Sequence, residues 1–124
     1  MTDETPGDDR RVLLVVHTGR TEAIGVACAV ANRLAAAGVR VRVLDTDAPS
    51  LDIAAAEVVP ADGQAASGCE MALVIGGDGT ILRGAELSRL ADTPLLGINL
   101  GHVGFMAEAE WDDVDSTVVA IVDR

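Results

Sequence analysis

The sequence contains no lysine and no tyrosine, and it has few histidines, cysteines, serines and aromatic residues. Without lysine there can be no phosphate-binding loop of the G-x-x-x-x-G-K-[ST] type, no Schiff-base nucleophile and no lysine general base. The four serines include no G-x-S-x-G sequence, which excludes a hydrolase nucleophile elbow. Two isolated cysteines and two isolated histidines cannot form a four-ligand structural zinc site.

The chain of 124 residues is strongly acidic, with 20 acidic side chains against nine basic ones, all of them arginine, and a formal charge of −11. This length is typical of about one domain. A domain this acidic repels phosphate backbones, so we expect no nucleic-acid partner.

Cys28 and Cys69 do not have the tight spacing of a disulfide framework, which predicts a reducing, cytoplasmic compartment. No apolar stretch approaches the roughly 20 residues that span a bilayer, so we expect a soluble protein without a membrane partner. Residues 1–11 are polar and acidic at their start, unlike a signal peptide, and we interpret them as a disordered lead. Residues 12–124 then form the folded domain.

The first half of that domain alternates between strand and helix patterns. Residues 12–16 are an unbroken apolar run, as in a strand buried on both faces of a parallel sheet. Residues 21–35 repeat apolar side chains at steps of three and four, which predicts a helix. Residues 39–45 alternate strictly, which predicts a strand nearer the sheet edge with Arg40 and Arg42 toward solvent.

The second half repeats this alternation after a punctuated stretch in which we expect a short helix over 51–56. Residues 71–75 predict a second buried strand, residues 81–90 a helix, residues 95–99 a third central strand, and residues 111–122 a last helix. Strands that alternate with helices predict an α/β fold with a doubly wound, mostly parallel sheet.

Three loops should meet at one edge of such a sheet, because the carboxyl ends of parallel strands lie along the same edge. They are HTGRT at 17–21, GGDGT at 76–80 and NLGHVG at 99–104. Open α/β sheets bind their ligands at this edge. His17 and His102 lie in these loops, but histidines in loops are commonly solvated, so we do not assign them to the site.

The GGDGT loop is the strongest functional signal because it joins a buried strand to a helix. Its glycines, with Thr80, allow the backbone to approach a phosphate, and amides at a helix start point toward an anion. A carboxylate in that position repels phosphate, so Asp78 fits a general base for a substrate hydroxyl, or an indirect Mg²⁺ partner, in phosphoryl transfer. The alternative is a tight turn in which Asp78 caps the helix.

GGDGT together with INLGHVGFMAE at 98–108 resembles the NAD kinase family, and VLLVVHTGR at 12–20 resembles its actinobacterial members. The resemblance covers nearly the whole chain from Val12 and implies a Rossmann-like N-terminal domain. It also implies phosphoryl transfer, with a divalent metal such as Mg²⁺, from ATP or inorganic polyphosphate to the 2′-hydroxyl of the adenosine ribose of NAD, and a homo-oligomer in the full-length form.

The resemblance assigns roles to individual positions. It implies that Asp78 accepts the proton, that Asp78 and Gly79 touch NAD, that Arg83 contacts the dinucleotide, and that residues 17–20 lie near the phosphoryl donor. Leu82 and Phe105 match apolar positions of the pocket. The expected cofactor-binding set is Gly76, Gly77, Asp78, Gly79, Thr80, Leu82, Arg83, Asn99, Gly101 and Phe105, with Asp78 catalytic and no metal ligand assigned.

The family's downstream Asn-Glu or Asn-Asp motif and its glycine-rich C-terminal domain have no counterpart in the sequence. We therefore expect an N-terminal part that is incomplete as an enzyme by itself. Two alternatives stay open: a lipid kinase, because such kinases share GGDGT, and a non-catalytic nucleotide-binding fragment.

Overall fold

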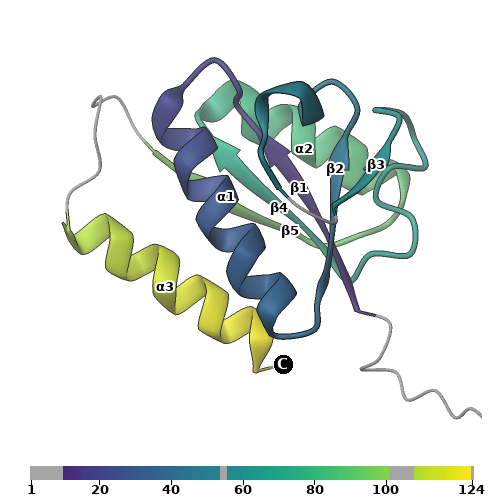
Figure 1. Cartoon of the computed structure of the whole chain (residues 1–124). Helices are drawn as coiled ribbons and strands as arrows, with labels where there is room; N and C mark the ends of the chain where they lie inside the picture. The colour runs from purple at the N-terminus through teal and green to yellow at the C-terminus, as the bar shows by residue number, and fades with distance from the viewer. Residues whose placement is uncertain (1–9, 54–55, 101–107, 124) are drawn as a thin grey trace, which may run out of the picture.

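A computed structural model describes residues 10–53, 56–100 and 108–123, and for residues 108–113 it describes the backbone alone. Strands and helices alternate along most of the chain (Figure 1). The elements are β1 Arg11–Val16, α1 Thr21–Ala36, β2 Arg40–Leu44, the 3₁₀ turn η2 Ala48–Ser50, β3 Glu57–Val59, β4 Met71–Gly76, α2 Asp78–Leu90, β5 Leu95–Asn99 and α3 Glu108–Val122.

The strands form one parallel sheet in the order β3-β2-β1-β4-β5. The chain winds outward from β1 through β2 to β3, then returns to place β4 on the other side of β1. The predicted α/β fold with a doubly wound parallel sheet is confirmed. The strand order reverses between β1 and β4, and this pair therefore marks the topological switch point of the sheet.

Helices cover both faces of the sheet, with α1 and α3 on one side and α2 on the other (Figure 1). The side chains of β1 alternate between the two resulting cores. Val12, Leu14 and Val16 pack with α1 and α3, whereas Leu13 and Val15 pack toward α2. The residues that face either core are apolar because helices cover both faces of the sheet. This explains the unbroken apolar run of β1. No helix in the described part of the chain has the length and apolar character needed to cross a membrane.

Arg42 on β2 does not face solvent as expected; its exposed fraction is 8%. Its Nη1 donates to the carbonyl oxygens of Ala65 at 2.9 Å and Ser67 at 2.7 Å, and its Nε donates to Glu57 Oε1 at 3.1 Å. The prediction was wrong because the turn near residues 65–67 and strand β3 cover this position. A guanidinium can be buried where its donors are all directed at acceptors.

Two further expectations are corrected by the structure. The helix expected over 51–56 is not found in the described residues of that range: the 3₁₀ turn η2 precedes it, residues 51–53 and 56 are irregular, and the short strand β3 follows. β5 is not a central strand, because among the described residues it lies at the sheet edge, with Leu95 and Leu96 exposed. Its apolar sequence therefore does not reflect burial within this part of the chain.

Arg10 ties the end of α3 to the sheet. Its guanidinium donates to both carboxylate oxygens of Glu70, each at 2.8 Å, and to the carbonyl oxygens of Ile121 at 2.5 Å and Val122 at 3.1 Å. These carbonyls are in the last turn of α3, where helical acceptors are unsatisfied. The hydrogen bonds that Arg10 donates to the Glu70 carboxylate raise the pKa of Arg10. Arg10 therefore holds the end of α3 against the edge of the sheet where β1 and β4 begin.

Gly84 is the point of closest approach between α2 and the sheet. A Cβ at this position would overlap Val74 Cγ2 on β4, whereas a Cβ at Gly25, on the exposed side of α1, would meet no atom within 4 Å. We expect Gly84→Ala to lower the free energy of unfolding by about 1–3 kcal/mol through overpacking. The matched Gly25→Ala should raise it by roughly 0.5–1 kcal/mol. Urea denaturation measures both, and equal effects of the two substitutions would contradict the packing.

Burial raises the pKa of the Cys69 thiol. Because the thiolate is the reactive form, we expect Cys69 to react more slowly with iodoacetamide at pH 8 than an unstructured cysteine peptide does. The Cys28→Ser variant isolates Cys69 for this measurement by mass spectrometry. Unfolding the variant in urea should remove the difference, and a folded-state rate equal to that of the peptide would count against the burial of Cys69.

Candidate functional site

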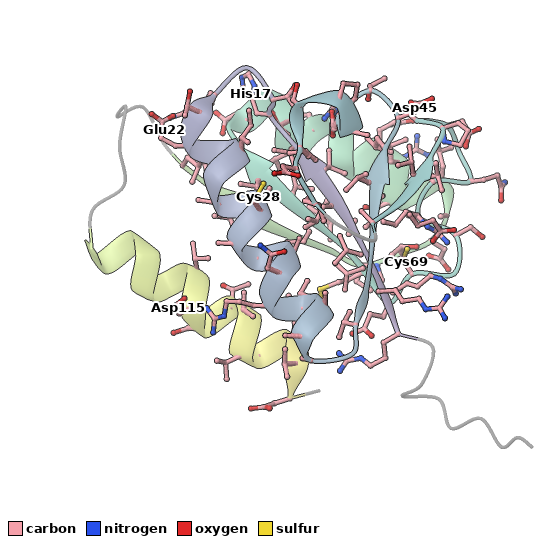
Figure 2. All side chains as sticks on the ribbon, in the orientation of Figure 1. His17, Glu22, Cys28, Asp45, Cys69 and Asp115 are labelled. Carbon is pink, nitrogen blue, oxygen red and sulfur yellow. The ribbon has the colours of Figure 1, made fainter. Side chains whose placement is uncertain are left out.

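A cavity of about 450 Å³ opens at the carboxyl ends of β1, β4 and β5. Its walls come from the first two of the loops that were expected to meet there and from Asn99 at the end of β5, and Figure 2 shows His17 at this edge of the sheet. The lining residues are His17, Arg20, Gly77, Asp78, Gly79, Thr80 and Asn99. The cavity lies beside the β1–β4 switch point, where open α/β sheets bind ligands.

Gly76, the last residue of β4, lies directly behind the cavity. A Cβ on Gly76 would lie 2.8 Å from His17 Cβ and 2.8 Å from Thr80 Oγ1. Such contacts are shorter than packing permits, so only glycine allows the two loops to come this close. Gly77 and Gly79 differ, because a Cβ at either position would meet no atom within 4 Å. These two glycines therefore leave open space within the cavity.

Helix α2 begins inside the GGDGT sequence. Gly77 is its N-cap, and the first helical hydrogen bond runs from Ile81 N–H to the Gly77 carbonyl oxygen at 3.0 Å. The amides of Asp78, Gly79 and Thr80 precede this bond and have no acceptor within the helix. Because the positive end of the helix dipole lies here, the cavity wall favours an anion.

Asp78 is exposed at the cavity surface, and its Oδ1 accepts a hydrogen bond from Asn99 Nδ2 at 3.1 Å. The bond joins the loop after β4 to the end of β5. The alternative in which Asp78 caps α2 is not what the structure shows, because Gly77 occupies the N-cap and Asp78 is the first helical residue. The Asp78 carboxylate is thus directed by a side chain and stays accessible from the cavity.

Two arginines lie next to these groups. Arg20, at the start of α1, lines the cavity, and its Nε is 3.6 Å from Glu22 Oε1. Arg83, on α2, borders an adjoining hollow of about 290 Å³ between the loop after β1 and the start of α2. Its Nη2 donates to the Val16 carbonyl oxygen at 3.1 Å and forms an ion pair with Asp47 Oδ2 at 3.2 Å. Both cations lie at the binding edge of an otherwise strongly acidic chain.

The structure brings half of the ten predicted site residues together in one cavity wall. The cavity wall contains Gly77, Asp78, Gly79, Thr80 and Asn99.

The other predicted residues are placed differently. Gly76 is buried directly behind the wall, Arg83 borders the adjoining hollow, and Leu82 is 71% exposed and does not line the cavity. The predictions for Gly101 and Phe105, like the remark on His102, lie outside the described residues.

Sequence reasoning gave no individual role to three polar side chains at this edge. The resemblance placed residues 17–20 near the phosphoryl donor, but His17 was set aside as a solvated loop histidine and Arg20 was not singled out, and both line the cavity. Asp47 is 2% exposed, but nothing in the neighbouring sequence predicts its burial, because the turn after β2 has the composition of an ordinary polar turn. Among the described residues, no three His, Cys, Asp or Glu side chains gather closely enough to hold a metal ion.

Comparisons with known proteins agree with this geometry. Residues 12–124 match the model of the ATP-NAD kinase N-terminal domain. The NAD kinase of Thermobifida fusca is 50% identical over 121 residues, which cover 94% of this chain and 37% of that protein. The NAD kinase of Mycobacterium tuberculosis is 48% identical over 125 residues, with 91% and 41% covered.

The fold also matches a solved structure, that of yeast NADH kinase complexed with NADH, with a TM-score of 0.65 and 18% identity over 93% of this chain and 37% of that one. The chain spans about two fifths of the length of the relatives it matches. From the match over residues 12–124 and these identities, the chain belongs to the NAD kinase family.

Proposed function

We propose that this chain is the part of an NAD kinase that contains the catalytic base. The enzyme transfers a phosphoryl group to the 2′-hydroxyl of the adenosine ribose of NAD to give NADP. The observation that carries the proposal is the exposed Asp78 carboxylate, directed by Asn99, in a glycine-lined cavity at the strand switch point. A carboxylate in a site otherwise suited to anions fits the removal of a proton from a neutral substrate group better than the binding of phosphate.

In the proposed step, Asp78 accepts the proton of the ribose hydroxyl while the hydroxyl oxygen forms a bond to the transferred phosphorus. The bond between that phosphorus and the donor oxygen breaks, and the donor leaves with the electron pair. The unpaired amides at the start of α2 and the Arg20 guanidinium would stabilise the charge on the phosphoryl oxygens. Asn99 keeps the carboxylate turned toward the cavity.

We propose NAD contacts for the residues around this step. Gly77 and Gly79 would leave room for the dinucleotide, Gly76 would contribute by letting the two loops meet behind it, and Thr80 and Asn99 would supply polar contacts. Arg83 would reach a dinucleotide group from the adjoining hollow. Leu82, which is exposed, and Phe105 would complete the apolar part of the pocket, as the resemblance implies, and Gly101 would be a further NAD contact.

The phosphoryl donor is proposed to be ATP or inorganic polyphosphate. The family resemblance implies a divalent cation such as Mg²⁺, but the described side chains at the cavity offer a single carboxylate, Asp78. That donor set does not fit a site in which this part of the chain alone holds the metal.

We also propose a reducing, cytoplasmic compartment, which the free thiols of both cysteines support.

We propose that the working enzyme, here termed the full-length enzyme, has a second domain that completes the site, because the relatives are more than twice as long as the matched span. The 124-residue chain should then bind NAD weakly and form little NADP. Calorimetric titration with NAD, alongside an NADP assay of this chain, tests the point. NADP formation at the rate of the full-length enzyme would show that no further domain is needed.

Replacing Asp78 by Asn in the full-length enzyme should leave the fold intact and reduce NADP formation about 10²–10⁴-fold, because the amide cannot accept the ribose proton. Asp45→Asn is a matched control, since Asp45 is an exposed carboxylate at the same edge of the sheet but does not line the cavity (Figure 2). Turnover is measured as NADP, with circular dichroism to check folding. Near-normal turnover by Asp78→Asn would rule out the proposed role.

Asn99 should matter through its hydrogen bond to Asp78. We expect Asn99→Ala to lower kcat about tenfold, the effect of losing one hydrogen bond to a charged group. Asn99→Asp should be worse, because it sets a second carboxylate against Asp78 instead of a donor. Steady-state NADP kinetics compares the two variants. Equal activity of Asn99→Asp and the unmodified enzyme would show that Asn99 does not direct Asp78.

A further inference from the structure

Asp47 is the most deeply buried carboxylate among the described residues, with 2% of its surface exposed. It lies in the turn after β2, in a stretch whose polar composition is typical of solvated loops. A carboxylate that leaves water needs hydrogen-bond donors and a compensating charge. Asp47 has both: its Oδ2 accepts the Val16 amide at 3.2 Å, and the Arg83 guanidinium lies beside both carboxylate oxygens.

The bond to Val16 completes the end of β1. β1 pairs with β2 only as far as Leu14↔Val43, so the Val16 amide lies beyond the last strand pairing on that side. The Asp47 carboxylate supplies the acceptor that a longer β2 would have provided. On its other side the chain is anchored as well, because the His17 amide donates to the Ile75 carbonyl oxygen at 3.0 Å. The loop that follows β1 and lines the site therefore starts from a position held on both sides.

The bond to Arg83 holds one end of a side chain and leaves the other end available. Nη2 of Arg83 is within 3.3 Å of both Asp47 oxygens and donates to the Val16 carbonyl oxygen. Nη1 and Nε form no hydrogen bond with any described residue, and the side chain is 42% exposed. Because the guanidinium is planar and its donors have fixed directions, holding Nη2 determines where the remaining donors point. Arg83 borders the hollow next to the cavity.

We infer that Asp47 is a positioning residue for ligand binding: it holds Arg83 by one nitrogen so that the remaining donors can meet an anionic group of the bound dinucleotide, and it anchors the loop after β1. The inference rests on the proposed function for the identity of that ligand. The role of Asp47 is geometric, because the Asp47 charge by itself opposes anion binding at Arg83.

Geometry and charge predict opposite effects of Asp47→Asn in the full-length enzyme. The Asn side-chain oxygen can still accept the Val16 amide, but the ion pair with Arg83 is lost. If the position of the Arg83 guanidinium matters most, KM for NAD rises about tenfold, as for the loss of one charge-assisted contact, while kcat changes less. If the Asp47 charge only weakened the field of Arg83, KM would fall. A fall in KM, or no change, overturns the inference.

Three further variants separate positioning from a general loss of structure. Asp47→Glu keeps the carboxylate, so its KM for NAD should stay close to that of the unmodified enzyme. Asp45 is an exposed neighbour in the same turn, and Asp45→Asn should leave KM unchanged. Asp47→Asn added to Arg83→Met should raise KM no further than Arg83→Met alone, because Asp47 acts through Arg83. If Asp47→Asn raises KM by the same factor in both backgrounds, Asp47 does not act through Arg83.

A measurement on the same enzyme without turnover separates failure of this inference from failure of the proposed function. Nitrogen NMR of Arg83 reports rotation of its guanidinium about the Nε–Cζ bond. We expect slow rotation in the unmodified enzyme and in Asp47→Glu, and fast rotation in Asp47→Asn. Absence of NADP formation by the unmodified enzyme would contradict the proposed function alone. Identical rotation in all three proteins would contradict the positioning role whatever the activity.

Discussion

The parallel pairing of β1 with β4 is the constraint on which the site depends. Their register runs from Val12↔Met71 to Val16↔Ile75, so both strands end at the same level. The chain leaves β1 toward α1 on one face of the sheet and leaves β4 toward α2 on the other. The two loops therefore separate at this point, and the space between them is the cavity that Asp78 faces. Gly76 permits their close approach behind it.

The sequence predicted the fold and the cavity correctly where a local pattern has one main physical explanation. Unbroken apolar runs predicted β1 and β4 correctly, because a strand covered on both faces is apolar at every position. The GGDGT pattern predicted where the cavity lies, because a glycine-rich link from a buried strand to a helix leaves open space at the carboxyl edge of the sheet. Half of the predicted site residues, from Gly77 to Thr80 together with Asn99, do line one cavity.

The errors came from side chains whose surroundings are determined by distant segments. Arg42 has the alternation of an exposed strand residue, but carbonyl groups more than twenty residues later bury it. β5 has the composition of a central strand, yet among the described residues nothing pairs with its outer edge. The burial of Asp47 depends on Val16 and Arg83, which come from two other elements. Local patterns carry no information about such partners.

In a chain without lysine, arginine does two kinds of work. Arg10 and Arg42 each bond a carboxylate together with backbone carbonyl groups, and they hold α3 and the turn before β4. Arg20 and Arg83 lie at the binding edge with part of their surface open. The planar guanidinium suits both tasks, because one side can be held by the protein while the other meets an anion. A net charge of −11 is thus compatible with a locally cationic site.

The position of the adenosine ribose in a crystal structure of the full-length enzyme with NAD tests the central claim most directly. The account predicts that the 2′-hydroxyl oxygen lies within roughly 3.2 Å of an Asp78 carboxylate oxygen, the distance that proton transfer requires. It also predicts that Asn99 still contacts the same carboxylate. A ribose bound away from the cavity, or turned so that another group faces Asp78, would contradict the assignment of Asp78 as the base.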